Sequence, residues 1–157
     1  MGFGEAVKVC FSKMFVFSGR ARRAEFWWFY LFITIISFVV SIVFMVIIFA
    51  SMAPLFASAD AYGNVSDEAL IAWFLGSLTA YGLLFVLSAA LSVMSLGVTA
   101  RRLHDMGQTG HWLWLYLVGL GIVPVIMCIM EGQPYTNQWG PDPKAAERGA
   151  PGAVAAV

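Results

Sequence analysis

The stretch FWWFYLFITIISFVVSIVFMVIIFASM, residues 26–52, decides the fold class. It contains no charged residue, and its polar side chains are limited to one threonine, three serines and one tyrosine. An α-helix needs about 20 mostly apolar residues to cross the roughly 30 Å of hydrocarbon in a bilayer. Residues 26–52 exceed that length, so they predict a transmembrane helix with room to tilt or to extend beyond the bilayer.

Two further charge-free runs follow in the chain. Residues 70–100 are long enough to predict a second transmembrane helix. Residues 112–130 are barely long enough, and they contain Gly119, Gly121 and Pro124. Proline removes a backbone hydrogen bond and kinks a helix, which membrane helices tolerate where neighbours satisfy the freed groups. The third run therefore predicts a third transmembrane helix, with a re-entrant hairpin turning near Gly121 and Pro124 as the alternative.

The composition agrees with an all-α, integral membrane helical bundle. The chain has 157 residues, of which 61% are hydrophobic and 11% are charged, whereas soluble domains are about 25% charged. Its nine basic and nine acidic residues cancel, so the charge gives no sign of a nucleic-acid partner. We expect one membrane domain over residues 1–143. The Ala, Gly and Pro content of residues 144–157 predicts a disordered tail.

The first residues predict a short amphipathic helix. At helical spacing, one face carries apolar side chains and the other carries Glu5, Lys8 and Ser12. Such a helix lies in the membrane interface with its lysines toward the headgroups. A cap packed against the end of the bundle is an equally good interpretation.

Basic residues predict the orientation of the chain. Five of them precede the first run, and Arg101 and Arg102 follow the second, whereas the connection over residues 53–68 carries only acidic charges. The positive-inside rule then places the N-terminus in the cytoplasm and this connection outside. Three transmembrane helices would place the C-terminus outside, although the mixed charges of the tail do not indicate its side. Within the outer connection, Ser66 is the expected N-cap of the second helix.

The polar side chains that could form a site are concentrated in two segments, residues 18–25 and 100–107. The first segment precedes the first predicted helix and the second ends the second predicted helix, both on the cytoplasmic side. We therefore expect one polar cap in which Glu25 and Asp105 neutralise nearby arginines. Arginines left over could hold anionic lipid headgroups or a protein partner, since each basic residue near an anionic surface contributes about 1 kcal/mol. The candidate residues are Arg20, Arg22, Arg23, Glu25, Arg101, Arg102, His104 and Asp105.

The sequence predicts neither a catalytic site nor a cofactor. His104, Asp105 and His111 could supply three metal ligands, but two glycines separate the histidines and no fixed helical spacing brings them together. Cys10 and Cys128 form no metal-binding motif. We therefore expect no metal, no cofactor and no enzymatic activity.

Three motifs resemble a known family. They are FSGRARRAEFW at residues 17–27, RRLHDMG at 101–107 followed by TGHW at 109–112, and NQWGPDP at 137–143. In this order they are similar to the YhaH-like bacterial inner-membrane proteins, the family labelled domain of unknown function 805. His111 stands where that family usually has tryptophan, and Trp139 where it usually has tyrosine. The resemblance implies a bacterial inner (cytoplasmic) membrane protein without an established activity.

Two functions remain open from the sequence. The first is a non-enzymatic accessory module that binds membrane lipids, associates with another membrane protein complex or forms a homo-oligomer. The second is a small oligomeric pore or carrier that uses the serine and threonine faces of the first two helices. The predicted spans lack an ionisable residue, which most ion pumps and proton-coupled carriers keep within a span, so the first is favoured.

Overall fold

The computed structural model describes residues 1–60 and 62–147. Over these residues the secondary structure is helical apart from one isolated antiparallel bridge between Asn137 and Gly140. The helices in chain order are α1 (Phe3–Ser12), α2 (Arg23–Ala57), α3 (Asp67–Asp105), the 3-10 helix η1 (Gly110–Tyr116) and α4 (Ile122–Met127). The predicted disordered tail lies largely outside the described residues, which end at 147.

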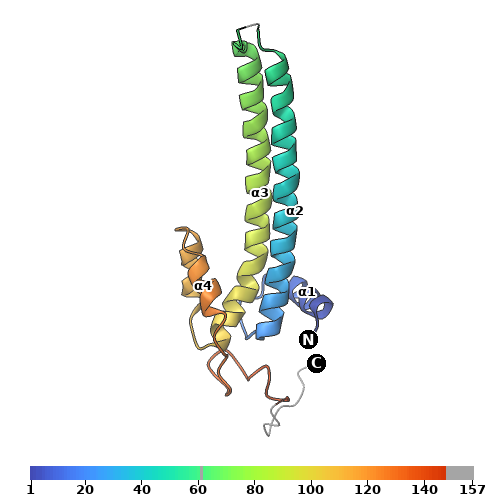
Figure 1. Ribbon diagram of the computed structural model, residues 1–157. Coiled ribbons are helices and arrows are strands. Elements are labelled where there is room, and N and C mark those ends of the chain that lie inside the picture. Colours follow the sequence, from blue (N-terminus) through green and yellow to red (C-terminus); the bar gives the residue numbers. More distant parts are fainter. Residues whose placement is uncertain (61, 148–157) are drawn as a thin grey trace. The chain divides into compact units, whose positions relative to one another are not determined.

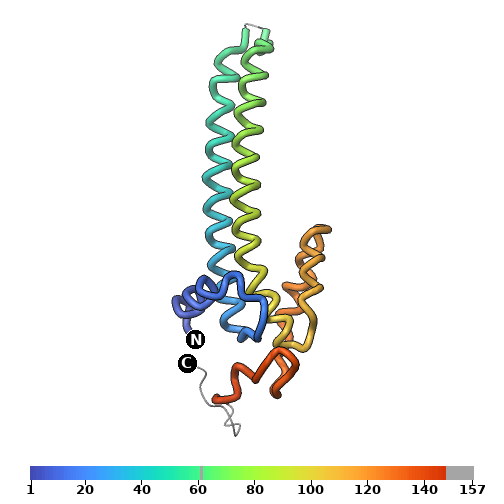
Figure 2. Tube along the Cα trace, turned by 180° about the vertical axis from the view of Figure 1, so that it is seen from behind, coloured from blue at the N-terminus to red at the C-terminus, as the bar shows by residue number. Residues whose placement is uncertain are grey.

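The chain divides into two compact units, of which residues 34–91 form one. In this unit α2 and α3 run antiparallel and side by side (Figures 1 and 2), and the Trp73 indole donates a 3.2 Å hydrogen bond to the Ser51 hydroxyl. Most large apolar side chains of the unit are exposed; Phe38, Phe49 and Phe85 are each at least 65% exposed. A water-soluble protein rarely leaves so large an apolar surface uncovered, so this surface is suited to lipid.

The two long helices contain the first two predicted spans. Helix α2 has 35 residues and α3 has 39, which at 1.5 Å per residue gives each more than about 50 Å. Both are long and apolar enough to cross a membrane. The predicted N-cap of the second is confirmed, because the Ser66 hydroxyl accepts a 3.2 Å hydrogen bond from the Ala69 N–H.

The predicted third transmembrane helix is not formed. Residues 112–130 hold part of η1, a turn and the six-residue α4, which is about 9 Å long. Gly119 takes a φ of +77°, a conformation that ends a right-handed helix. Tyr116 then lies so close to Gly121 that a Cβ there would meet its ring at 2.6 Å. We call residues 110–127 the apolar hairpin.

The second unit comprises residues 1–33 together with the chain from residue 92 onward. Helix α1 packs on the start of α2, where Phe11 makes edge-to-face contacts with Phe29 and Phe32. Ala6 and Cys10 of α1 are buried, so the contacts expected of a packed cap are present. Gly97 of α3 allows the chain after α1 to approach closely, because a Cβ there would lie 2.3 Å from the Met14 carbonyl oxygen.

Candidate functional site

The core of the second unit holds charged side chains from both arginine segments. Arg20 precedes α2, Glu25 lies in its first turn, and the other members come from the C-terminal end of α3. We call this cluster the arginine cap and define it as Arg20, Glu25, Arg101, Arg102, His104 and Asp105.

Glu25 and Arg101 form the first ion pair of the arginine cap. Arg101 Nη2 donates to Glu25 Oε1 at 3.0 Å, and the two side chains are 3% and 8% exposed. Arg101 Nη1 also donates to the carbonyl oxygens of Lys13 and Val16, at 2.7 and 2.6 Å. One buried arginine thus holds together α3, the start of α2 and the chain that follows α1.

Asp105 lies between two arginines. Arg20 Nε donates to Asp105 Oδ1 at 2.8 Å, and Arg102 Nη1 donates to Asp105 Oδ2. All three side chains are at most 5% exposed. Gly132 packs directly over the carboxylate, since a Cβ there would lie 1.9 Å from Asp105 Oδ2.

The remaining donors of Arg20 and Arg102 bind the backbone of the C-terminal segment. Arg20 donates to the carbonyl oxygens of Gln133 at 2.5 Å, Tyr135 at 2.7 Å and Gly140 at 3.3 Å. Arg102 donates to those of Cys128, at 3.3 Å, and Met130. These carbonyls follow α4 in irregular backbone, so the arginines supply the hydrogen-bond partners that buried backbone acceptors require.

His104 completes the arginine cap on the side of Trp139. Its Nδ1 lies 3.2 Å from the Gly19 carbonyl oxygen, and its ring stacks on the Trp139 indole with centroids 4.6 Å apart and an interplanar angle of 6°. The Asn137 amide donates to the His104 carbonyl oxygen at 2.9 Å. The three sequence motifs therefore meet in one cluster.

Cys10 lies beneath the first ion pair. Its Sγ is 3.8 Å from Glu25 Oε1 and 3.9 Å from the Glu25 carbonyl oxygen. Burial, and then the neighbouring Glu25 carboxylate, raise the pKa of the Cys10 thiol to about 12. A thiol held protonated is a poor nucleophile and a poor metal ligand.

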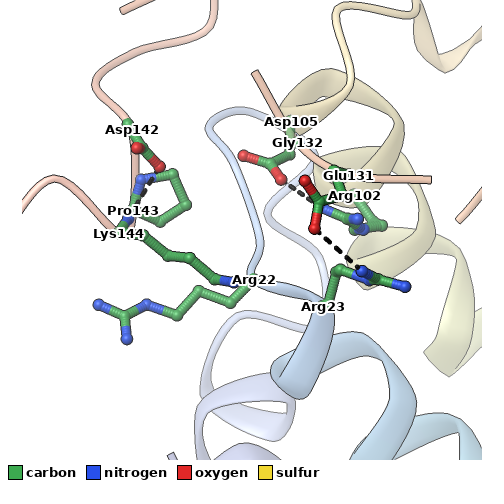
Figure 3. Close-up of a pocket in the computed structure, with 9 residues that line it drawn as sticks. All are labelled: Arg22, Arg23, Arg102, Asp105, Glu131, Gly132, Asp142, Pro143 and Lys144. Atoms are coloured by element: carbon green, nitrogen blue, oxygen red, sulfur yellow. Dashed lines mark hydrogen bonds and ion pairs between the residues drawn. The ribbon is translucent and has the colours of Figure 1, made fainter. Parts of the chain in front are cut away.

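Arg22 and Arg23 stand outside this buried cluster, and we call them the outer arginines. Their side chains are 26% and 38% exposed. Arg23 Nη1 lies 3.6 Å from Glu131 Oε1, and Arg22 pairs with Glu147, whose side chain is 60% exposed. Figure 3 shows the Arg23 and Glu131 side chains pointing toward one another.

The pocket beside the outer arginines is small. Its further lining residues include Arg102, Asp105, Asp142 and Lys144 (Figure 3). It holds about 20 Å³, room for a single water molecule. A larger anion could therefore bind only at its rim, where the outer arginines and Lys144 are.

Comparison with known proteins identifies the family. The model of the family described as "Protein of unknown function (DUF805)" matches residues 14–141. The chain belongs to this family. In Escherichia coli K12, the inner membrane protein YhaI is 30% identical over 132 residues, covering 82% of this chain and 86% of YhaI. The inner membrane protein YhaH is 31% identical over 131 residues, covering 82% and 87%. No solved structure matches the chain.

The DUF805 match includes every residue of the arginine cap and both outer arginines. All eight candidate residues lie in the second unit, but their environments differ. The side chains of Arg20, Arg101 and Arg102 are buried and bind groups within the fold, whereas those of Arg22 and Arg23 are more exposed. Among the described residues, no group of three or more His, Cys, Asp or Glu side chains is arranged so that it could hold a metal ion.

The C-terminal acceptors of the buried arginines could not be predicted from the sequence. They are main-chain carbonyls of residues 128–140, whose positions no side-chain pattern reveals. The motif NQWGPDP was the available signal, because it holds Asn137, Trp139 and Gly140, which all contact the arginine cap.

Proposed function

We propose that this DUF805 protein is a non-catalytic, multi-pass inner-membrane module whose cytoplasmic end binds the phosphates of anionic lipids through Arg22 and Arg23. The observation that carries the proposal is the contrast between the two sets of arginines. The buried three bind Glu25, Asp105 and main-chain carbonyls within the fold, whereas the outer two are adjacent, more exposed and paired with exposed carboxylates. Exposed pairs contribute only about 0–1 kcal/mol, so a phosphate can replace Glu131 or Glu147.

A topology with two transmembrane helices supports this arrangement. Arg20, which precedes α2, contacts the backbone of residues 133–140, and this contact favours placing both segments on the same side of a membrane. Helices α2 and α3 would cross the bilayer, and the basic segments would face the cytoplasm by the positive-inside rule. The C-terminal segment would then be cytoplasmic, unlike in the arrangement with three spans.

In this proposal the apolar hairpin enters the cytoplasmic leaflet without crossing it. Its turn exposes Leu117 and Val118 by 76% and 68%. The Tyr116 hydroxyl hydrogen-bonds that of Thr99 in α3. This bond places η1 beside the part of the second predicted span that directly precedes the arginine cap. Non-helical backbone is tolerated at membrane depth only against protein or water, and the contact with α3 offers such support.

Lipid binding is tested with the full-length protein in mild detergent. We expect phosphatidylglycerol to raise the melting temperature of the wild type more than phosphatidylcholine with the same acyl chains. The double variant Arg22→Gln, Arg23→Gln should lose that difference while keeping its melting temperature without lipid. The matched control Lys8→Gln, Lys13→Gln removes the same charge from exposed positions of the N-terminal segment and should keep the response. An unchanged response in the first variant would refute the proposal.

The alternative function, an oligomeric pore or carrier, has a different structural requirement. It requires the hydroxyls of Ser37 and Ser41 to face a water path. The Ser41 hydroxyl donates to the Ser37 carbonyl oxygen at 2.8 Å within α2, a local bond that needs no water path. Flux through reconstituted vesicles that disappears in the variant Ser37→Leu, Ser41→Leu would favour transport over lipid binding.

A further inference from the structure

We propose that the groove between η1 and the C-terminal segment is a second headgroup site, which binds the primary ammonium of phosphatidylethanolamine. This second site rests on the proposed function, because it requires the groove to lie at the membrane surface. Its binding chemistry does not involve the outer arginines. The groove is open and holds about 350 Å³, within the range of small-molecule sites. Its lining residues are His104, Thr109, Gly110, His111, Trp114 and Trp139.

His104 offers a fixed hydrogen-bond acceptor to this groove. Because a carbonyl oxygen only accepts, the Nδ1 atom that faces Gly19 carries the ring proton. The Nε2 atom of the neutral ring then presents a lone pair. It lies 3.6 Å from the position that a Cβ of Gly110 would take, and Gly110 also lines the groove.

The histidine ring cannot easily turn away. The residue is 9% exposed, and Trp139 stacks on it in a nearly parallel orientation. The bonds that position it come from the other two motifs: the Gly19 carbonyl binds the ring, and the Asn137 amide binds the main chain. A preorganised acceptor loses little conformational entropy when a donor binds.

The other side chains define which donor fits. The indoles of Trp114 and Trp139 line the groove, and indole faces attract cations. Neither lysine nor arginine is among the lining residues, in contrast to the pocket of Figure 3. An alkylammonium with an N–H bond satisfies both the lone pair and the aromatic surface.

The position of the groove favours a lipid as the source of this ammonium. Trp114, which is 66% exposed, belongs to η1 and leads directly into the exposed apolar turn of the hairpin. Tryptophan is enriched where membrane meets water. A ligand at this boundary can place its ammonium in the groove and its acyl chains along the hairpin.

The test compares lipids with the same acyl chains by native mass spectrometry of the full-length protein. Phosphatidylethanolamine should be retained about tenfold more tightly than phosphatidylcholine, whose ammonium has no N–H; tenfold corresponds to about 1.4 kcal/mol. Trp114→Leu should remove this preference. The matched control is Trp112→Leu, at a tryptophan of the same helix that is absent from the groove lining. Equal retention of both lipids by the wild type would overturn the proposal.

A second measurement reports on the acceptor itself. In nanodiscs, the ¹⁵N resonance of His104 Nε2 should shift with phosphatidylethanolamine and stay unchanged with phosphatidylcholine. Water-soluble O-phosphoethanolamine should bind far more weakly; equal affinity would overturn the lipid as source. The variant Arg22→Gln, Arg23→Gln should keep the preference for phosphatidylethanolamine, which separates a failure of this site from a failure of the proposed function.

Discussion

Arg20 Nε donates a 2.8 Å hydrogen bond to Asp105 Oδ1, although the two residues are 85 positions apart. Their side chains are 2% and 5% exposed. The carboxylate therefore compensates two buried guanidinium groups, since Arg102 binds its other oxygen. This arrangement explains why charged residues can form the core of a small unit.

Asp105→Asn should destabilise the protein strongly. The amide cannot neutralise Arg20 and Arg102, and removing one partner of a buried ion pair costs about 3–5 kcal/mol. Chemical unfolding of the purified protein in detergent measures this loss. The control Asp67→Asn changes an exposed carboxylate in the first turn of the same helix, α3, where a dipole contribution is worth about 0.3–1 kcal/mol. Equal effects of the two variants would contradict the compensating role of Asp105.

Gly97→Ala and Gly76→Ala should have opposite effects although both glycines lie in α3. A Cβ at Gly97 would meet the Met14 carbonyl oxygen at 2.3 Å, whereas a Cβ at Gly76 meets nothing within 4 Å. Overpacking costs about 1–3 kcal/mol, while alanine is favoured over glycine in a helix by about 1 kcal/mol in water. Melting temperatures in detergent should fall for the first variant and stay level or rise for the second. Equal melting temperatures of the two variants would contradict the special contact of Gly97.

Cys10 should resist thiol reagents in the folded protein. With a pKa of about 12, only about one thiol in ten thousand is ionised at pH 8, and the thiolate is the reactive form. Mass spectrometry after maleimide treatment should show modification only once denaturant is added. Modification of Cys10 at the rate of a free thiol in the native state would contradict this.

The same pKa predicts how stability changes with pH. The folded state keeps the Cys10 proton up to a pKa of about 12, whereas the unfolded thiol titrates near 9. Its contribution is therefore present below pH 9 and lost as the pH rises from about 9 to about 12. Comparing unfolding of the wild type and Cys10→Ala across this window isolates the contribution, because the variant lacks it.

The long helices could be predicted from the sequence because their apolar runs are visible in the local sequence. The charge-free runs in α2 and α3, and the N-cap Ser66, need no tertiary information. The pairing of Glu25 with Arg101 was also predictable in kind, since the positive-inside rule brings both arginine segments to one side of the membrane.

The structure of the third charge-free run, residues 112–130, could not be predicted from local sequence alone. Residues 112–130 are as apolar as a transmembrane helix, and their fold depends on Gly119 taking a positive φ and on Tyr116 packing against Gly121. The partners of Arg20 were equally hidden, because they are main-chain carbonyls that any residue type supplies. Main-chain carbonyls also bind Arg101 and Arg102, and this distinguishes the three buried arginines from the more exposed Arg22 and Arg23.

The last prediction tests the proposed topology with two spans. A membrane-impermeant maleimide applied to intact cells should label a cysteine at Tyr62, which is 91% exposed in the outer connection, and should not label one at Gln138. Opening the cytoplasmic side should make Gln138→Cys reactive, because its segment is joined to Arg20. Val118→Cys at the turn of the apolar hairpin should stay unlabelled from both sides, since lipid has no water to support thiolate formation. Labelling of Gln138→Cys from outside would instead require residues 112–130 to cross the membrane, and it would separate Arg20 from the carbonyls of Tyr135 and Gly140.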